Sequence, residues 1–174
     1  SAHGYLLSEF LSPDINTRSD AWGGSLENRA RIHLEIIKRC RAEVGADFPI
    51  SVKLNSADFQ KGGFTANESI QVAKMLEDAS VDIIEISGGS YEQPKQIGAD
   101  DLSINPDRSE ERKESTIARE AYFLEYANNI RKAVSLPLMV TGGFRTREGI
   151  ENALQSNICQ MVGVGRPLCA DPYC

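Results

Sequence analysis

The 174-residue sequence lacks the features that mark several large classes of protein. Its apolar runs all fall short of the roughly 20 residues that span a bilayer, so we expect no membrane partner. It has no cluster of Lys and Arg, and its formal net charge is −6. A surface of that charge argues against a nucleic-acid partner. The sequence opens with Ser-Ala-His-Gly rather than with a basic and then apolar segment, so no signal peptide is expected.

Motifs for metal binding and for nucleophilic catalysis are missing as well. The sequence contains no Walker loop and no nucleophile elbow. Its four cysteines lack the spacing of metal ligands, and we expect reduced thiols in a cytoplasmic protein: Cys40, Cys159, Cys169 and Cys174. There is no starting methionine either, and the chain opens within what reads as a motif, which suggests a fragment.

What the sequence does contain is an alternation of helical and strand patterns. Residues 1–24 are predicted to be loop, because Pro13 and Gly23-Gly24 interrupt them. Ser25 is predicted to cap a helix that runs to about Val44. Further helical patterns follow the capping pair Thr65 and Glu68, begin near residue 116, and occupy 147–155. Short apolar strands are predicted at 50–54, 81–86, 138–141 and 160–164. This order predicts an α/β fold with parallel strands and right-handed crossovers.

The number of strands limits the architecture. A closed (β/α)8 TIM barrel needs eight strands, and four are predicted, so the chain is either half of such a barrel or a small open α/β sheet. We expect residues 1–174 to form a single domain. Residues 90–113 are polar and charged with few apolar side chains, and are predicted to be an excursion loop.

Glycines follow the last two predicted strands. Gly142 and Gly143 end one strand, and Gly165 with Arg166 ends the next. Glycine lets the backbone approach a ligand and offers bare N–H groups, and arginine adds a planar cation suited to phosphate. Because the loops after the last two strands of a TM barrel commonly bind phosphate, these four residues predict a phosphate site.

Lys53 is the single charged residue of its predicted strand. Charges at such positions usually have a partner. One hypothesis is contact with a bound anion, and a second is a Schiff-base lysine made nucleophilic by desolvation. A lysine on an edge strand that extends its ammonium group to solvent remains the structural alternative.

His3 and Tyr5 flank Gly4 near the start of the chain. An imidazole can hydrogen-bond a carbonyl or anionic oxygen, and a phenol can deliver a proton. The alternative is a capping histidine with a half-buried tyrosine. We expect His33, within a predicted helix, to be structural. Arg18, Asp20 and Arg29 are likewise expected to form one structural salt-bridge network.

Two runs of residues carry a resemblance to a known family: His3-Gly-Tyr-Leu-Leu with Phe10-Leu-Ser-Pro13, and Asn16-Thr-Arg-Ser-Asp20 with Trp22-Gly-Gly-Ser-Leu-Glu-Asn-Arg29. Two later segments, Thr141-Gly-Gly-Phe144 and Val162-Gly-Val-Gly-Arg166, resemble the last two strand ends of the same family. With these motifs, the chain resembles the old yellow enzyme family over nearly its whole length. These are FMN-dependent NAD(P)H oxidoreductases on a (β/α)8 barrel. The resemblance implies the C-terminal half of that barrel, since four strands and their flavin contacts are missing.

The resemblance also implies roles for individual residues. His3 matches the second member of a pair that binds the substrate carbonyl, and the first member would precede Ser1. Tyr5 matches the tyrosine that protonates the substrate. Lys53 stands where the family usually has an arginine beside the flavin, so it keeps the charge but loses the planar fork. The implied FMN phosphate grip is Gly142, Gly143, Gly165 and Arg166.

The activity implied by the resemblance is hydride transfer from NAD(P)H through FMN to an activated, enone-type alkene. Two alternatives stay open at this point. One is a phosphate-binding barrel lyase that uses Lys53 as a Schiff base, and the other is an inactive half-barrel that binds FMN or phosphate. The sequence does not fix the oligomeric state, and a homo-oligomer stays open.

Overall fold

The computed structural model describes residues 2–88, 122–144, 146–165, 168–169 and 171. The excursion predicted at 90–113 and the predicted phosphate ligand Arg166 therefore lie outside the described residues. So does the first part of the helix predicted from about residue 116.

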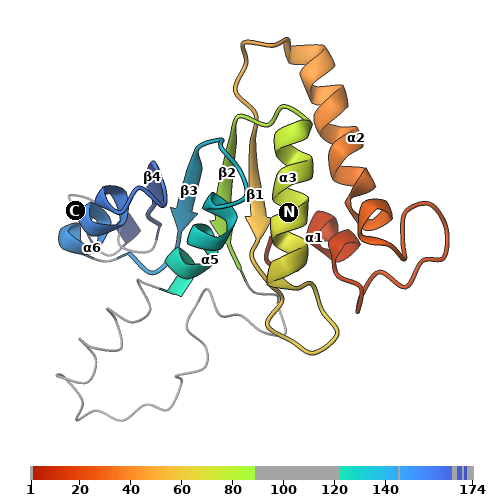
Figure 1. Cartoon of the computed structure of the whole chain (residues 1–174), viewed down its shortest axis with the longest axis horizontal. Helices are drawn as coiled ribbons and strands as arrows, with labels where there is room; N and C mark the ends of the chain where they lie inside the picture. Colours follow the sequence, from red (N-terminus) through yellow and green to blue (C-terminus); the bar gives the residue numbers. More distant parts are fainter. Residues whose placement is uncertain (1, 89–121, 145, 166–167, 170, 172–174) are drawn as a thin grey trace.

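Four parallel strands form one sheet in the order β1-β2-β3-β4 (Figure 1). They are β1 (Ser51–Asn55), β2 (Ile83–Ser87), β3 (Leu138–Thr141) and β4 (Met161–Gly163). All four predicted strands are confirmed, with boundaries moved by one or two residues. Each strand lies beside the one before it in sequence, as in a TM barrel, whereas the strand order of a doubly wound sheet reverses at a switch point.

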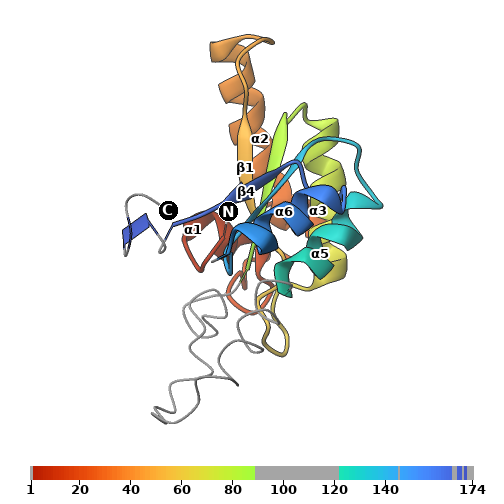
Figure 2. The same cartoon turned by 90° about the vertical axis from the view of Figure 1, so that its left-hand side faces the viewer.

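Helices alternate with these strands and cover one side of the sheet. They are α2 (Leu26–Val44), α3 (Ala66–Asp78), α5 (Tyr122–Arg131) and α6 (Arg147–Gln155). Figure 2 shows α3, α5 and α6 together on one side. The predicted caps are confirmed: Ser25 accepts from the Asn28 N–H, and Thr65 with Glu68 forms a complete capping box.

The predicted loop at residues 1–24 is wrong in part, because Leu6–Leu11 form a short helix, α1. Its six residues are too few to show a helical period. Its N-cap position is Tyr5, which makes no side-chain capping hydrogen bond. Burial rather than local propensity stabilises it, since Leu11 is 1% exposed and joins the main core.

The two faces of the sheet differ sharply. Side chains on the helix-covered face are buried in the core, and Ile84, Ile86, Leu138 and Val140 are each 0% exposed. The opposite face, here called the open face, carries two rows of register partners. The lower row is Lys53, Glu85, Met139 and Met161, and the upper row is Asn55, Ser87, Thr141 and Gly163. The open face is more polar, as expected for a face that lines a site rather than a core. Its lower row is partly or fully exposed, whereas Asn55 and Ser87 of the upper row are buried.

Candidate functional site at the carboxyl ends of the strands

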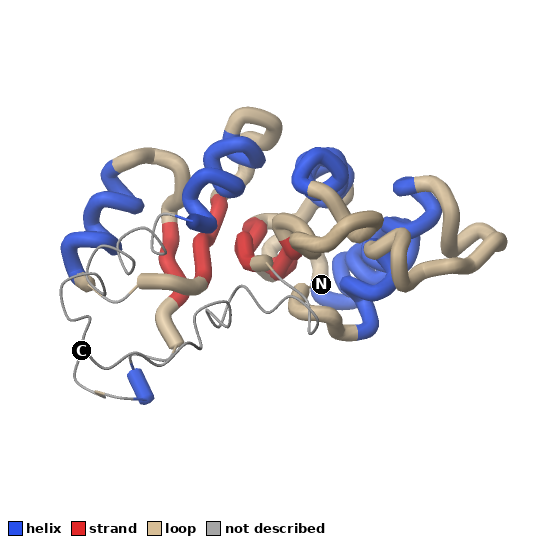
Figure 3. Tube along the Cα trace, turned by 90° about the horizontal axis from the view of Figure 1, so that it is seen from below, coloured by secondary structure: helices blue, strands red, loops and turns tan. Residues whose placement is uncertain are grey.

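The upper row of the open face lies where the four strands end. Figure 3 views the molecule from the side toward which the strand arrows of Figure 1 point, with the helices arranged along the outside of the strands. The carboxyl ends of parallel strands meet at one edge, which is where α/β proteins place their ligands.

The glycines predicted to hold phosphate are brought together at this edge. Thr141 and Gly163 are register partners, so the residues that follow them leave the sheet side by side. Gly142 and Gly143 have φ angles of 110° and 90°, which side chains rarely tolerate. A Cβ placed on Gly165 would meet no heavy atom within 4 Å. The backbone here is thus open and locally left-handed, which fits a phosphate-binding cradle.

Thr141 and Gly163 also make a close contact that the sequence did not suggest. A Cβ on Gly163 would lie 2.0 Å from Thr141 Oγ1, so no larger residue fits there unless Thr141 moves. The Thr141 hydroxyl is buried and has no hydrogen-bond partner among the described residues. Its unpaired oxygen leaves a polar atom free for a ligand beside the glycine cradle.

Lys53 pairs with a residue that sequence reasoning missed. Its Nζ lies 2.5 Å from Oε1 of Glu85, its register partner on β2. The two side chains are 32% and 16% exposed. The sequence signal was weak, because the strand predicted at 81–86 holds two acids, Asp82 and Glu85, and only the strand register decides which one faces Lys53. Because the ammonium group donates to a carboxylate, this geometry does not favour the Schiff-base alternative.

His3 reaches the upper row from the start of the chain. Its Nε2 lies 2.6 Å from Ser87 Oγ, and Ser87 is another residue that sequence reasoning missed. Burial, and then the positive charge of Lys53, lower the pKa of His3 from 6.5 to about 4. The imidazole is therefore neutral at pH 7. His3, Lys53 and Glu85 thus form one electrostatically linked cluster.

Tyr5, the other predicted catalytic residue, is 61% exposed and lies just before α1. It follows His3 by two residues, and the chain between them turns through positive φ angles at His3 and Gly4. The alternative of a half-buried tyrosine is wrong for this structure. The Tyr5 side chain therefore lies at the surface, at the start of α1, rather than in the core.

The residues that were expected to be structural are paired with other residues of the chain or buried in the fold. Arg18 pairs with Asp20 on the surface. Arg29 is 4% exposed, donates to the Leu11 and Gly24 carbonyl oxygens, and pairs with Glu68. His33 is 3% exposed, and burial lowers its pKa to about 4. The predicted salt bridges are confirmed, although as two separate pairs rather than one network.

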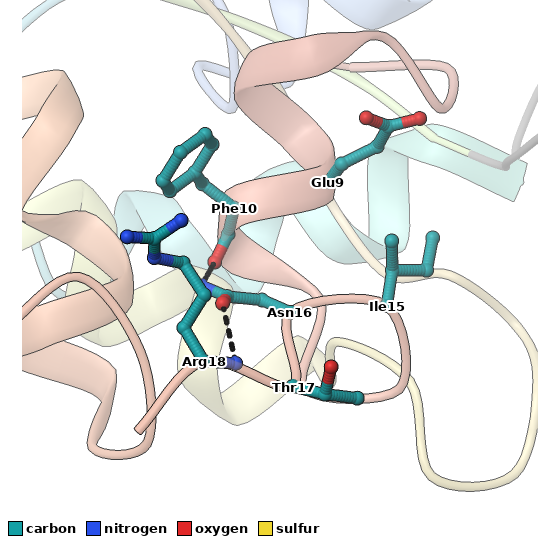
Figure 4. Close-up of a pocket in the computed structure, with 6 residues that line it drawn as sticks. All are labelled: Glu9, Phe10, Ile15, Asn16, Thr17 and Arg18. Carbon is teal, nitrogen blue, oxygen red and sulfur yellow. Dashed lines mark hydrogen bonds between the residues drawn. The ribbon is translucent and has the colours of Figure 1, made fainter. Parts of the chain in front are cut away.

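Two hollows of about 220 Å³ each lie beside α1. Figure 4 shows the first, where Asn16 ties the end of α1 to the following loop through the Phe10 carbonyl oxygen and the Arg18 N–H. It contains none of the predicted site residues. The second lies between α2 and β1, is mostly apolar, and includes Lys53.

The described residues contain neither a metal-binding cluster nor a helix that could cross a membrane. No group of three or more His, Cys, Asp or Glu side chains is arranged to hold a metal ion there. In the same part of the chain, every helix is too short or too polar to cross a membrane.

The sequential parallel sheet, its outer helices and the glycine-lined strand ends define a protein of the (β/α)8-barrel class, and the described residues form four of the eight strands that a closed barrel has. Within that class, the chain belongs to the NADH:flavin oxidoreductase / NADH oxidase family, whose model matches residues 1–174. Membership of this family implies FMN as the cofactor and NADH as the electron donor.

Curated relatives agree with this assignment. The chain is 40% identical over 176 residues to the NADH-dependent flavin oxidoreductase iliE of Hypocrea jecorina, covering 99% of this chain and 41% of that protein. It is 39% identical over 171 residues to an NADH oxidase of Thermoanaerobacter brockii, covering 98% of this chain and 24% of that protein. The chain thus spans less than half the length of these relatives.

Solved structures show the same partial coverage. A 2-naphthoyl-CoA reductase matches with a TM-score of 0.78 and 36% identity, over 97% of this chain and 24% of that one. The old yellow enzyme homologue from Zymomonas mobilis matches with a TM-score of 0.68 and 25% identity, over 99% and 42%. The predicted barrel fold and the predicted family are confirmed.

Proposed function

We propose that this protein is an FMN-dependent oxidoreductase that transfers hydride from NAD(P)H to an activated, enone-type alkene. The observation that carries the proposal is that His3 meets the end of β2 and the glycines follow β3 and β4, with the Lys53–Glu85 pair one row below on the same face. A site of this kind offers a phosphate grip, a fixed positive charge and a hydrogen-bonding imidazole within one open face.

FMN would be held by residues of the first strand and by residues that follow the last two. The backbone of Gly142, Gly143 and Gly165 accommodates the phosphate, and Arg166 adds its guanidinium. Lys53 lies in the lower row, where its ammonium group can stabilise negative charge on the ring system. When bound, the flavin supplies the redox step, taking a hydride from NAD(P)H and delivering one to the alkene.

The other side chains act on the substrate. The neutral His3 imidazole donates a hydrogen bond to the substrate carbonyl oxygen, where charge develops as the β-carbon accepts hydride. Tyr5 delivers a proton to the α-carbon. Glu85 holds the Lys53 side chain on the open face through their ion pair, so that its charge has a fixed position.

The test is to purify the full-length protein, add FMN, remove unbound flavin and measure flavin absorbance. Bound flavin whose colour bleaches with NADH and returns with an enone is the expected result. No retained flavin, even after FMN is added, would refute the proposal. Trapping of Lys53 by borohydride with a carbonyl substrate would instead favour the lyase. Flavin that binds but never bleaches would favour a half-barrel without turnover.

Two variants separate the roles of the site residues. Arg166→Ala should weaken FMN binding about tenfold or more, because one charge-assisted contact to phosphate is lost. Tyr5→Phe should leave FMN binding and bleaching by NADH unchanged and slow the return of colour with an enone. An equal loss in both half-reactions of Tyr5→Phe would contradict its role as proton donor.

A further inference from the structure

Ser87 is placed to determine which ring nitrogen of His3 carries the hydrogen. It is the last residue of β2 and is 0% exposed. Its hydroxyl oxygen lies 2.6 Å from His3 Nε2, although 84 residues separate the two in sequence. The backbone of His3 has a φ of 63°, an uncommon conformation for a residue with a side chain. The chain thus adopts a costly local turn at the residue whose ring meets Ser87.

A neutral imidazole has one nitrogen that donates and one that accepts, and a fixed partner decides which is which. Two arrangements would satisfy the contact between His3 and Ser87. Either the serine hydroxyl donates to Nε2 and the hydrogen of the ring sits on Nδ1, or Nε2–H donates to the serine oxygen. The second arrangement obliges the buried serine hydrogen to find another acceptor.

Neither neighbour of Ser87 in the upper row accepts a hydrogen bond from its hydroxyl group. Its register partner on β1 is Asn55, and on β3 Thr141 follows Val140, the register partner of Ile86. Asn55 Oδ1 and Thr141 Oγ1 are both buried and form no hydrogen bond with any described residue. A buried donor left unpaired is rarer than an acceptor left with a free lone pair. The hydroxyl hydrogen of Ser87 therefore points to His3 Nε2.

We propose that Ser87 is a positioning residue that donates to His3 Nε2 and holds His3 as the neutral Nδ1–H tautomer. Nδ1 makes no hydrogen bond with a described residue, so its N–H is available to a ligand. That this ligand is the substrate carbonyl rests on the function proposed above, whereas the tautomer does not.

The charges that face His3 keep the ring neutral, as a fixed tautomer requires. Lys53 opposes protonation of the imidazole, and Glu85 favours it, with burial as the largest effect. These side chains come from β1 and β2, while Tyr5 follows on the chain itself. Burial and Lys53 lower the pKa of His3 by more than Glu85 raises it, so the ring stays uncharged at pH 7. The contact with Ser87 then decides which ring nitrogen carries the hydrogen.

The tautomer can be measured directly by long-range ¹H–¹⁵N NMR on flavin-free protein labelled with ¹⁵N-histidine at pH 7. The chain has two histidines, so His3→Gln assigns the signals. In the wild type, the ¹⁵N shift of Nδ1 should be that of a protonated nitrogen, and that of Nε2 an unprotonated one. In Ser87→Ala the Nδ1–H form should fall from the major to the minor population.

Two further variants make the outcome decisive. Ser87→Cys keeps the shape and a weak donor, so it should give an intermediate population of the Nδ1–H form. Ser56→Ala removes a buried hydroxyl that has no hydrogen-bond partner among the described residues, and should leave the His3 signals unchanged. A wild-type ring protonated on Nε2, or a Ser87→Ala spectrum like that of the wild type, would overturn the proposal. Because no flavin is present, a failed FMN titration would not affect this result.

Discussion

Lys53 of β1 and Glu85 of β2 are register partners whose charged groups meet at 2.5 Å on the open face of the sheet. The pair sets the position of a positive charge close enough to influence His3. Because the two residues lie 32 positions apart, this arrangement depends on the register between two strands. The ion pair thus connects Lys53, the predicted flavin contact, with His3, the predicted substrate contact.

The charge on Lys53 should be visible in the titration of His3. In Lys53→Met the pKa of His3 should rise from about 4 toward its ordinary value, because a nearby positive charge is removed. In Glu85→Gln it should move lower still, since Glu85 raises it. NMR titration of the imidazole C–H signals measures both shifts. Lys61→Met removes the same charge from an exposed loop and serves as the control. A His3 pKa equal in all four proteins would contradict the cluster.

Acid should weaken the fold through His33 before the carboxylates titrate. Below about pH 6.5 the unfolded chain takes up a proton on this residue, whereas the folded chain does so only near pH 4. The free energy of unfolding should therefore fall between these values by about 1 kcal/mol per pH unit. Urea unfolding at pH 7 and pH 5 measures the change. His33→Gln should make the slope shallower, and a slope unaltered by that change would exclude His33 as its source.

Adding a methyl group at Gly163 should destabilise the protein, while the same change at Gly165 should not. The new Cβ of Gly163→Ala would overlap the Thr141 side chain, and overpacking of this kind costs about 1–3 kcal/mol. Gly165→Ala meets no neighbouring atom. Thermal unfolding of both variants without FMN gives the comparison. Thr141→Ala removes Oγ1 and Cγ2 but keeps the Cβ at 2.9 Å, so it should rescue Gly163→Ala in part. No rescue at all would mean that the Thr141 hydroxyl and methyl groups are not the obstacle.

The two ion-paired arginines near the N-terminus should respond very differently to substitution. Arg29→Ala removes a buried cation that bridges α1, α2 and α3, and should cost about 3–5 kcal/mol. Arg18→Ala breaks an exposed pair and should leave the midpoint of urea unfolding unchanged, because solvent screens such pairs. Similar midpoints for the two variants would show that the Arg29 contacts do not stabilise the fold.

Local sequence patterns were enough to locate most of the secondary structure. The strands were visible as short apolar runs, and the helix that begins after Thr65 was visible from its capping box. The glycine pairs marked the carboxyl edge because only glycine tolerates the positive φ angles found at Gly142 and Gly143. The short helix α1 was missed, since its stability comes from the burial of Leu11 rather than from its own residues.

Local sequence patterns did not predict which side chains contact one another within the site. Glu85 and Ser87 lie in an ordinary apolar strand pattern, and nothing local connects them with Lys53 or His3. Parallel pairing places Lys53 opposite Glu85, and a turn at His3 brings its ring to Ser87. The sequence by itself determined the kinds of element, their order and the family. The tertiary structure alone decided which side chains meet, because strand register and chain reversal act between residues that are distant in sequence.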